Sequence, residues 1–120
     1  MNSGVVEVQL TPGERELLIH GLGEWGGPTR PTEVLAPAMG FENVQELLHG
    51  TARIAAALGR GEALTPEDWA RAQIATEIAF ASDYYGSGWD WSITQGHDDE
   101  VTIRRLRDIQ RKLITVARLG

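Results

Sequence analysis

Three side chains that could together hold a metal ion fall on one expected helical face. His20 lies four residues from both Glu16 and Glu24, a spacing that places all three on the same side of a helix and would suit a divalent cation. Glycines at positions 21 and 23 interrupt that helix, however, and charge pairs at this spacing are common on helix surfaces. We therefore expect no metal site here and no cofactor.

A glutamate in apolar surroundings is the candidate for acid–base chemistry. The helical neighbours of Glu77 are Gln73, Ile74, Phe80 and Ala81, an unusually apolar setting for a carboxylate. We expect Glu77 to pair with one of the arginines, and a general-acid or ligand role is the alternative. No nucleophile elbow or phosphate-binding loop accompanies it, and the chain has no cysteine, so the sequence favours a protein that is not an enzyme.

Aromatic residues are concentrated in one short segment. Four of the eight in the chain, Tyr84, Tyr85, Trp89 and Trp91, fall within eight positions, in and just before a stretch that begins and ends with glycine. Trp89 and Trp91 alternate with polar residues, which is typical of an extended segment. Two interpretations stay open. The favoured one places the tryptophans as a plug at one end of the core, and the other makes them a recognition patch.

Composition narrows the class of protein. A chain of 120 residues is long enough for one domain, so we expect residues 1–120 to form a single helical domain. There is neither a basic, apolar leader nor an apolar run of membrane-spanning length, and the absence of cysteine removes any need for an oxidising compartment. We expect a cytoplasmic protein that is not in a membrane. Ten of its eleven basic residues are arginine, which is typical of GC-rich bacteria.

Helix boundaries can be located from capping residues. Thr11, Pro12 and Glu14 form a capping box at the start of the first helix, and Thr65 repeats this arrangement before another. The acids at positions 98–100 suit the start of the last helix. We expect a first helix from residue 12, a short one over 32–39, a third over 42–58, a fourth from 65 to about 85 and a last one to about 119. The fourth is apolar nearly all round. The apolar faces of the others are Leu17, Leu18, Leu22 and Trp25 for the first; Val44, Leu47, Leu48, Thr51, Ile54, Ala55 and Leu58 for the third; and Ile103, Leu106, Ile109, Leu113 and Val116 for the last.

These elements predict a mainly α fold, a helical bundle of four main helices and one short helix. Residues 5–10 alternate between apolar and polar side chains, as a short strand does. A lone strand needs a partner, and residues 89–94 are the candidate. A small two-stranded element beside the bundle is therefore part of the expectation.

Charge is distributed unevenly along the chain. Residues 101–120 carry six basic side chains against one acid, Asp108, so this part has a charge of +5 and the other hundred residues carry −11 of the total of −6. The favoured interpretation is that a basic helix docks on an acidic body. The alternative is a basic stripe for a partner, formed by Arg104, Arg105, Arg107 and Arg111.

Short motifs along most of the chain also suggest a resemblance. The motifs are residues 10–14, Glu24-Trp25-Gly26-Gly27-Pro28, Gly86-Ser87-Gly88 with Trp91 and residues 94–96, and Leu106-Arg107 with Gln110-Arg111-Lys112. With these the chain resembles small uncharacterised helical proteins of GC-rich bacteria. The resemblance implies a single helical domain and no activity, cofactor or catalytic residue.

The leading functional hypothesis is a small cytoplasmic protein–protein interaction or regulatory module that binds another protein or its own copy. Its contact would be the aromatic segment or the N-terminal strand, whose unpaired edge invites dimerisation. The second hypothesis is a small-ligand binder or an enzyme, with a pocket among Trp25, Glu77, Tyr84, Tyr85, Trp89 and Trp91. The third is weak nucleic-acid binding through the basic last helix, which the surplus of acids elsewhere disfavours.

Overall fold

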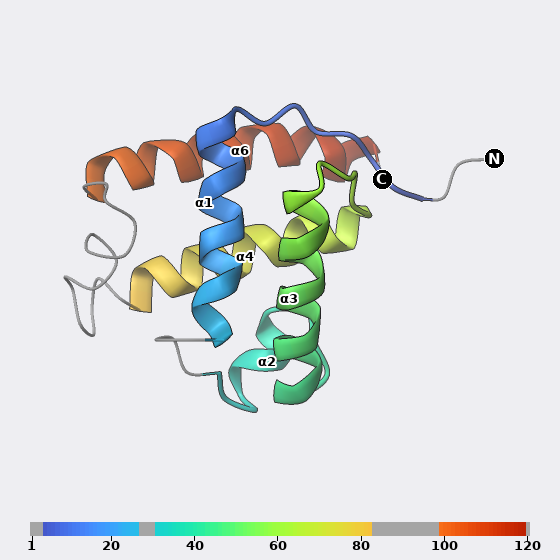
Figure 1. Cartoon of the computed structure of the whole chain (residues 1–120), viewed down its shortest axis with the longest axis vertical. Coiled ribbons are helices and arrows are strands. Elements are labelled where there is room, and N and C mark those ends of the chain that lie inside the picture. The colour runs from blue at the N-terminus through green and yellow to red at the C-terminus, as the bar shows by residue number, and fades with distance from the viewer. Residues whose placement is uncertain (1–3, 27–30, 83–98, 120) are drawn as a thin grey trace.

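The molecule consists of helices in two crossed layers. The computed structural model describes residues 4–26, 31–82 and 99–119. Within them α1 and α3 lie side by side and cross over α4, and α6 runs alongside α4 and crosses α1 near its start (Figure 1). The described elements are α1 (Pro12–Gly23), the 3-10 helix η1 (Glu24–Gly26), α2 (Leu35–Ala38), α3 (Val44–Gly59), α4 (Pro66–Ser82) and α6 (Asp99–Leu119). The expectation of a mainly α fold with four main helices and one short helix is confirmed.

The helices begin where side chains cap their free N–H groups. At α1 the capping box is complete, because the Thr11 hydroxyl accepts from the N–H of Glu14 at 3.1 Å and the Glu14 carboxylate accepts from the N–H of Thr11 at 2.9 Å. The side chain of Asn43 caps α3, which begins at Val44, two residues later than the expected start at 42. Before α4, the Thr65 hydroxyl accepts from the N–H of Asp68 at 3.1 Å.

The N-terminal segment does not form the expected strand. In the described part of the chain it makes an isolated bridge, in which the N–H of Val6 donates to the carbonyl of Leu64 at 2.7 Å. The carbonyl of Val6 accepts instead from the indole N–H of Trp69 at 2.8 Å, so a side chain takes the place of a ladder. The proposed partner, residues 89–94, lies outside the described residues.

The core forms where α1 meets α4. The predicted α1 face of Leu17, Leu18, Leu22 and Trp25 is buried throughout. Gly21 permits the approach, because a Cβ at this position would overlap the side chain of Thr76 on α4. Next to it Trp25 is 1% exposed, and its indole N–H donates to the carbonyl of Ala75 at 3.0 Å. Trp25 is therefore a core residue whose polar atom already has a partner.

Two apolar residues were assigned to the wrong side of their helices. Ile103 was expected to be buried, but it is 53% exposed and its neighbour Thr102 is buried instead. On α3, Leu48 is 39% exposed, whereas Gly50 is buried against the ring of Phe41. At each of these positions a smaller residue nearby is buried instead. The rest of the predicted faces is largely confirmed, since Leu106 and Ile109 on α6 are buried, as are Leu47, Thr51, Ile54 and Leu58 on α3.

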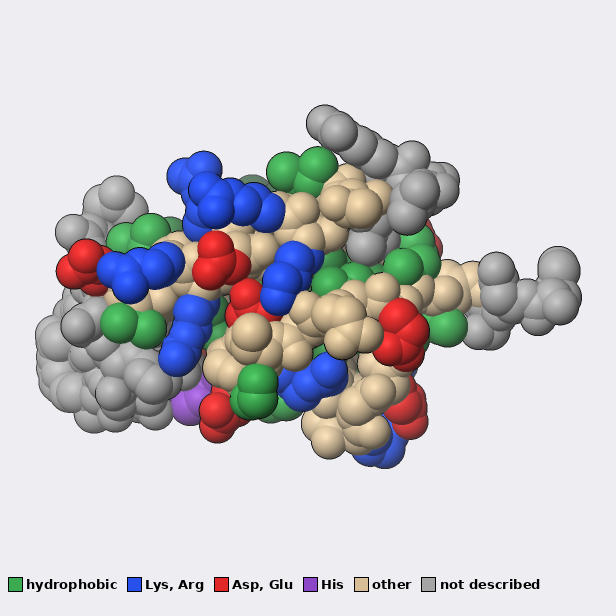
Figure 2. Space-filling view, turned by 90° about the horizontal axis from the view of Figure 1, so that it is seen from above, with side chains coloured by type: hydrophobic (Ala, Val, Ile, Leu, Met, Phe, Trp, Pro, Cys, Tyr) green, Lys and Arg blue, Asp and Glu red, His purple; other side chains and the backbone are tan. Residues whose placement is uncertain are grey.

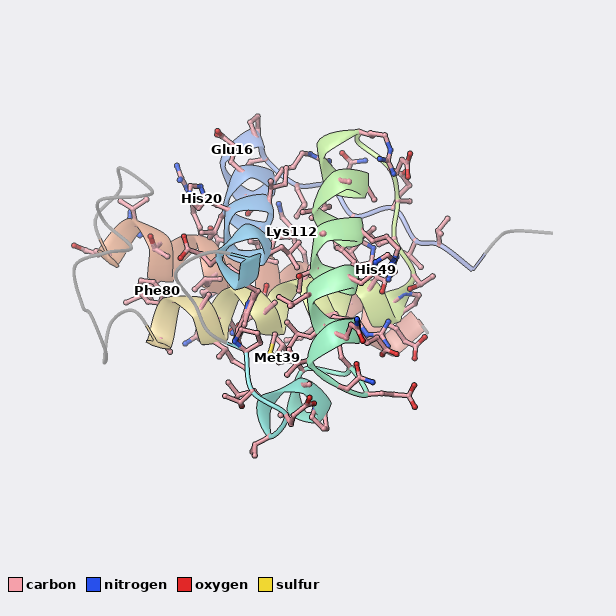
Figure 3. The ribbon with its side chains drawn as sticks, turned by 60° about the horizontal axis from the view of Figure 1, so that its bottom comes forward. Glu16, His20, Met39, His49, Phe80 and Lys112 are labelled. Carbon is pink, nitrogen blue, oxygen red and sulfur yellow. The ribbon has the colours of Figure 1, made fainter. Side chains whose placement is uncertain are left out.

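A partly buried ion pair docks α6 on α1. The ammonium group of Lys112 (labelled in Figure 3) lies 2.6 Å from the Glu14 carboxylate and donates to the carbonyl of Gln9 at 2.8 Å. Burial raises the pKa of Glu14, but the hydrogen bonds from Lys112 and Thr11 outweigh this effect and leave the pKa lowered. At this point the basic helix does lie on the acidic part of the chain.

We predict that this ion pair makes stability depend on pH. Because the folded pKa of Glu14 lies below its ordinary value of 4.5, the carboxylate contributes stability that is complete above pH 4.5 and is lost as pH falls through the folded pKa. Urea unfolding of the wild type and of Glu14→Gln across this range should show a shallower acid slope for the variant. Equal slopes would contradict the assignment. The exposed pair Arg60–Glu62 serves as control, since Glu62→Gln should barely alter stability.

We also predict that Gly21 and Gly23 respond oppositely to the same substitution. Gly21→Ala should lower the free energy of unfolding by roughly 1–3 kcal/mol, because the methyl group forces α1 away from Thr76. A Cβ at Gly23 would meet nothing within 4 Å, so Gly23→Ala should leave stability unchanged or raise it by up to about 1 kcal/mol. Thermal and urea unfolding of both variants measure this, and equal effects would contradict the close approach.

Candidate interaction site between α4 and α6

The two sides of α4 differ in what they contact. One side, which includes Ala72, Ala75, Thr76 and Ala79, is buried, and its contacts with Gly21 and Trp25 show that it faces α1. The opposite side carries Ala70, Ile74, Glu77 and Ala81, which are exposed or half-buried. The spacing of these four residues places them on one helical face. The layer of α4 and α6 thus has a second surface that α1 does not cover.

An apolar groove lies on this surface between the two helices. Its walls are Ala70, Gln73 and Ile74 from α4 and Gln110, Leu113 and Ile114 from α6, and its volume is about 360 Å³. We call it the α4–α6 groove. Four of its six lining residues are aliphatic, and the two glutamines provide its polar atoms. An open hollow of this composition can accept an apolar side chain together with one or two hydrogen bonds.

Gln73 and Gln110 of the groove wall, together with the neighbouring Glu77, form what we call the polar centre. The Nε2 groups of Gln73 and Gln110 both donate to Oε2 of Glu77, which ties α4 to α6. Gln73 is 7% exposed, and its Oε1 is buried without a hydrogen-bond partner among the described residues. Buried polar atoms rarely lack a partner, so this oxygen marks a place where a donor is missing.

The expected partner of Glu77 was an arginine, and the described structure gives two glutamine amides instead. Gln110 on α6 reaches Glu77, whereas Arg104 and Arg107 are exposed. Glu77 itself is half-buried, as the apolar neighbours in its sequence suggested.

A second hollow adjoins the groove. It is about 260 Å³ in volume and shares Ala70 and Ile74 with the groove; its other lining residues are Pro37, Ala38, Met39, Gly40, Glu67 and Arg71. Arg71 is held in place there, since it pairs with Asp68 at 3.1 Å, donates to the carbonyl of Gly40 at 3.0 Å and lies 5.0 Å from the centre of the Phe41 ring. This hollow therefore has a fixed cationic wall.

Asp68 connects this wall to α3. Its two carboxylate oxygens accept from the guanidinium of Arg53 at 2.9 and 3.1 Å, in addition to the bond from Arg71. Burial raises the pKa of Asp68, but hydrogen bonds from the two arginines outweigh it and leave the pKa lowered. The network is consistent with a structural role that fixes α3, α4 and the turn at residues 40–41.

The edge of α6 beside the groove carries a row of four residues, of which Gln110 is half-buried and the other three are exposed. Ile103, Arg107, Gln110 and Ile114 follow one another at steps of four, three and four, which places them on one helical face. We call this row the α6 edge. Ile103 and Ile114 are 53% and 52% exposed, and Arg107 is exposed and makes no ion pair with a described residue. Viewed from above, basic side chains are spread over the molecule with acidic and hydrophobic ones among them (Figure 2).

Of the residues assigned to a binding pocket from sequence, the structure places two. Trp25 is buried on the α1-facing side of α4, and Glu77 lies in the polar centre on the other side, so they do not share a pocket. Tyr84, Tyr85, Trp89 and Trp91 lie outside the described residues, and their role stays a prediction.

The histidine on α1 makes a contact with one of the expected neighbours. His20 lies 3.8 Å from the Glu24 carboxylate, and Glu16 and His20 lie on the same outer side of the helix (Figure 3). Burial lowers the pKa of His20 more than the charge of Glu16 raises it. Among residues 4–26, 31–82 and 99–119, no group of three acidic, histidine or cysteine side chains is placed to hold a metal ion.

Comparison with known proteins gives no relative. No protein-family model, curated protein or solved structure matches the chain. A separate finding concerns the helices: none in the described part of the chain has both the length and the apolar character needed to cross a membrane.

We predict that Glu77 and Gln110 are energetically coupled across the groove. Removing either side chain breaks the bond between α4 and α6, so Glu77→Ala and Gln110→Ala should destabilise the protein together by less than the sum of their separate effects, with a coupling energy of about 1 kcal/mol. Urea unfolding of the two single variants and the double variant measures it. The control is the double variant Glu77→Ala with Arg104→Ala. Arg104 pairs with Glu100 and not with Glu77, so the effects of these two substitutions should add.

Proposed function

We propose that this protein is a small cytoplasmic protein–protein interaction module that associates with its own copy through the surface of the α4–α6 groove. The observation that carries the proposal is the groove itself, an open aliphatic hollow beside a buried acceptor that lacks a donor. Both features are unfavourable in water, since apolar surface stays hydrated and a buried carbonyl oxygen stays unpaired. A protein partner on this surface would cover the apolar walls, and the buried oxygen would gain a donor where the partner inserts a polar side chain beneath them.

The exposed residues of α6 support an interface at this position. Ile103 and Ile114 are large apolar side chains on a helix whose other exposed residues include Glu100, Arg104 and Arg111. Exposed apolar side chains beside an apolar groove mark interaction sites on many proteins. The second hollow extends the same surface toward α2, which gives a partner a larger area than one pocket offers.

A small-ligand binder is the second candidate, and the volume of the groove favours it. A hollow of about 360 Å³ is large enough for a small organic molecule. Such a ligand would combine an aliphatic part with an N–H or O–H donor, because Gln73 Oε1 and the Glu77 carboxylate are acceptors. The groove offers no nucleophile, so we favour binding over catalysis.

Nucleic-acid binding through α6 has less support. Two of its arginines already have acidic neighbours, Arg104 with Glu100 at 3.3 Å and Arg111 with Asp108 at 3.7 Å. Lys112 is committed to Glu14. Retention on a DNA column at low salt, lost as salt is raised, would favour this function over the proposed one.

We predict a dimer in solution that depends on Ile114. Sedimentation equilibrium should give twice the monomer mass for the wild type, and Ile114→Asp should shift the protein to monomer, because a charge would be buried in an apolar contact. Val5→Asp is the matched control. Val5 is 41% exposed on the N-terminal segment, which we had considered as an alternative contact.

The outcomes separate the possible contacts. A wild type that is monomeric at every accessible concentration would refute self-association. A dimer that survives Ile114→Asp but is lost in Val5→Asp would move the interface to the N-terminal segment. A dimer that survives both would point to the aromatic segment with Trp89 and Trp91.

A further inference from the structure

The α6 edge has a spacing that is the same in both directions, since its residues follow at steps of four, three and four. Isoleucine stands at both ends, positions 103 and 114, and Arg107 and Gln110 exchange places when the direction is reversed. We propose that two copies of this chain pair through antiparallel α6 edges, and that Arg107 of each copy completes the polar centre of the other. The proposal rests on the self-association described above and specifies its register and chemistry.

The register follows from the spacing. A two-fold axis makes an interface self-complementary, so residues equally far from the axis meet their counterparts. When that axis passes midway between Arg107 and Gln110, Ile103 of one copy meets Ile114 of the second copy, and Arg107 meets Gln110. Apolar side chains then meet apolar ones at both ends of the contact. The polar residues meet in its middle.

The chemistry at the middle of the contact is complementary. Gln110 belongs to the polar centre, where Gln73 Oε1 has no donor and both amide bonds go to Oε2 of Glu77. The guanidinium of Arg107 carries five N–H donors and no acceptor, and it makes no ion pair with a described residue. Arg107 of the second copy therefore brings donors and a positive charge to a site that holds acceptors and a negative charge.

α6 carries more basic than acidic side chains, so two copies of it repel each other in part. On the flank of the edge, Arg104 pairs with Glu100 and Arg111 pairs with Asp108 within the same helix. Beside the edge, the aliphatic walls of the groove lie next to the incoming helix. The two α4–α6 pairs would then form an antiparallel four-helix arrangement, in which the groove of each copy is covered by α6 of the other.

A charge exchange tests the contact between copies. In a dimer of the Glu77→Arg variant, position 77 of each copy faces Arg107 of the other, so like charges meet at both symmetric contacts. In a dimer of the Arg107→Glu variant, position 107 of each copy faces Glu77 of the other, so like charges meet there too. In a mixed dimer both contacts pair opposite charges. Each variant alone should therefore dimerise more weakly than the wild type, by roughly 30-fold or more in Kd, and an equimolar mixture should recover a heterodimer. Sedimentation equilibrium measures the masses, and differently tagged variants identify the heterodimer.

Controls separate this inference from the proposed function. Arg60→Glu makes the same charge change on an exposed turn residue and should leave the dimer intact. Arg107→Gln, which removes an exposed side chain without an intramolecular ion pair, keeps the test valid if Glu77→Arg fails to fold. A monomeric wild type would overturn both proposals. A wild-type dimer that is unaffected by Arg107→Glu, or a mixture of folded variants without heterodimer, would overturn this register and leave self-association standing.

Discussion

The close contact of α1 with α4 is the constraint on which the rest of the described structure depends. Gly21 lets the backbone of α1 approach Thr76, and at that distance the indole of Trp25 reaches the carbonyl of Ala75. When one face of a helix packs into such a contact, its opposite face is left for other contacts or for solvent. On α4 that face carries Ala70 and Ile74, and the groove beside α6 exists because α1 occupies the other side.

Much of the fold could be predicted because it is encoded locally. Capping needs residues within one turn of a helix start, so Thr11 and Thr65 could be recognised without knowledge of any distant contact. The apolar face of α1 was predicted in full for a similar reason. Its leucines and Trp25 are the only large apolar groups available on that side of the helix, so no neighbouring residue competes for burial.

The candidate site was harder to predict because it depends on how helices are rotated against each other. Adjacent positions on a helix differ by about 100° in direction. A periodic pattern therefore does not decide whether Thr102 or Ile103 belongs to the buried face, because either residue fits at the end of that face. The partner of Glu77 is also set by a contact between two helices. Gln110 is 33 residues away in sequence, and no local rule separates this amide from the arginines around it. The α6 edge could have been found by applying the helical spacing from Ile103 to the exposed face of the helix instead of the buried one.

The Glu14 carboxylate accepts one hydrogen bond from a residue nearby in sequence and one from the other end of the chain. It therefore couples the formation of the first helix to the docking of the last. One of its hydrogen bonds spans three residues, and the contact with Lys112 spans 98. The local bond can form as soon as the first turn of α1 does, whereas the distant one requires closure of a loop that includes almost the whole chain. The first helical turn therefore acquires its full protection only when the last helix docks. Opening of that turn and undocking of α6 should accordingly be one event rather than two.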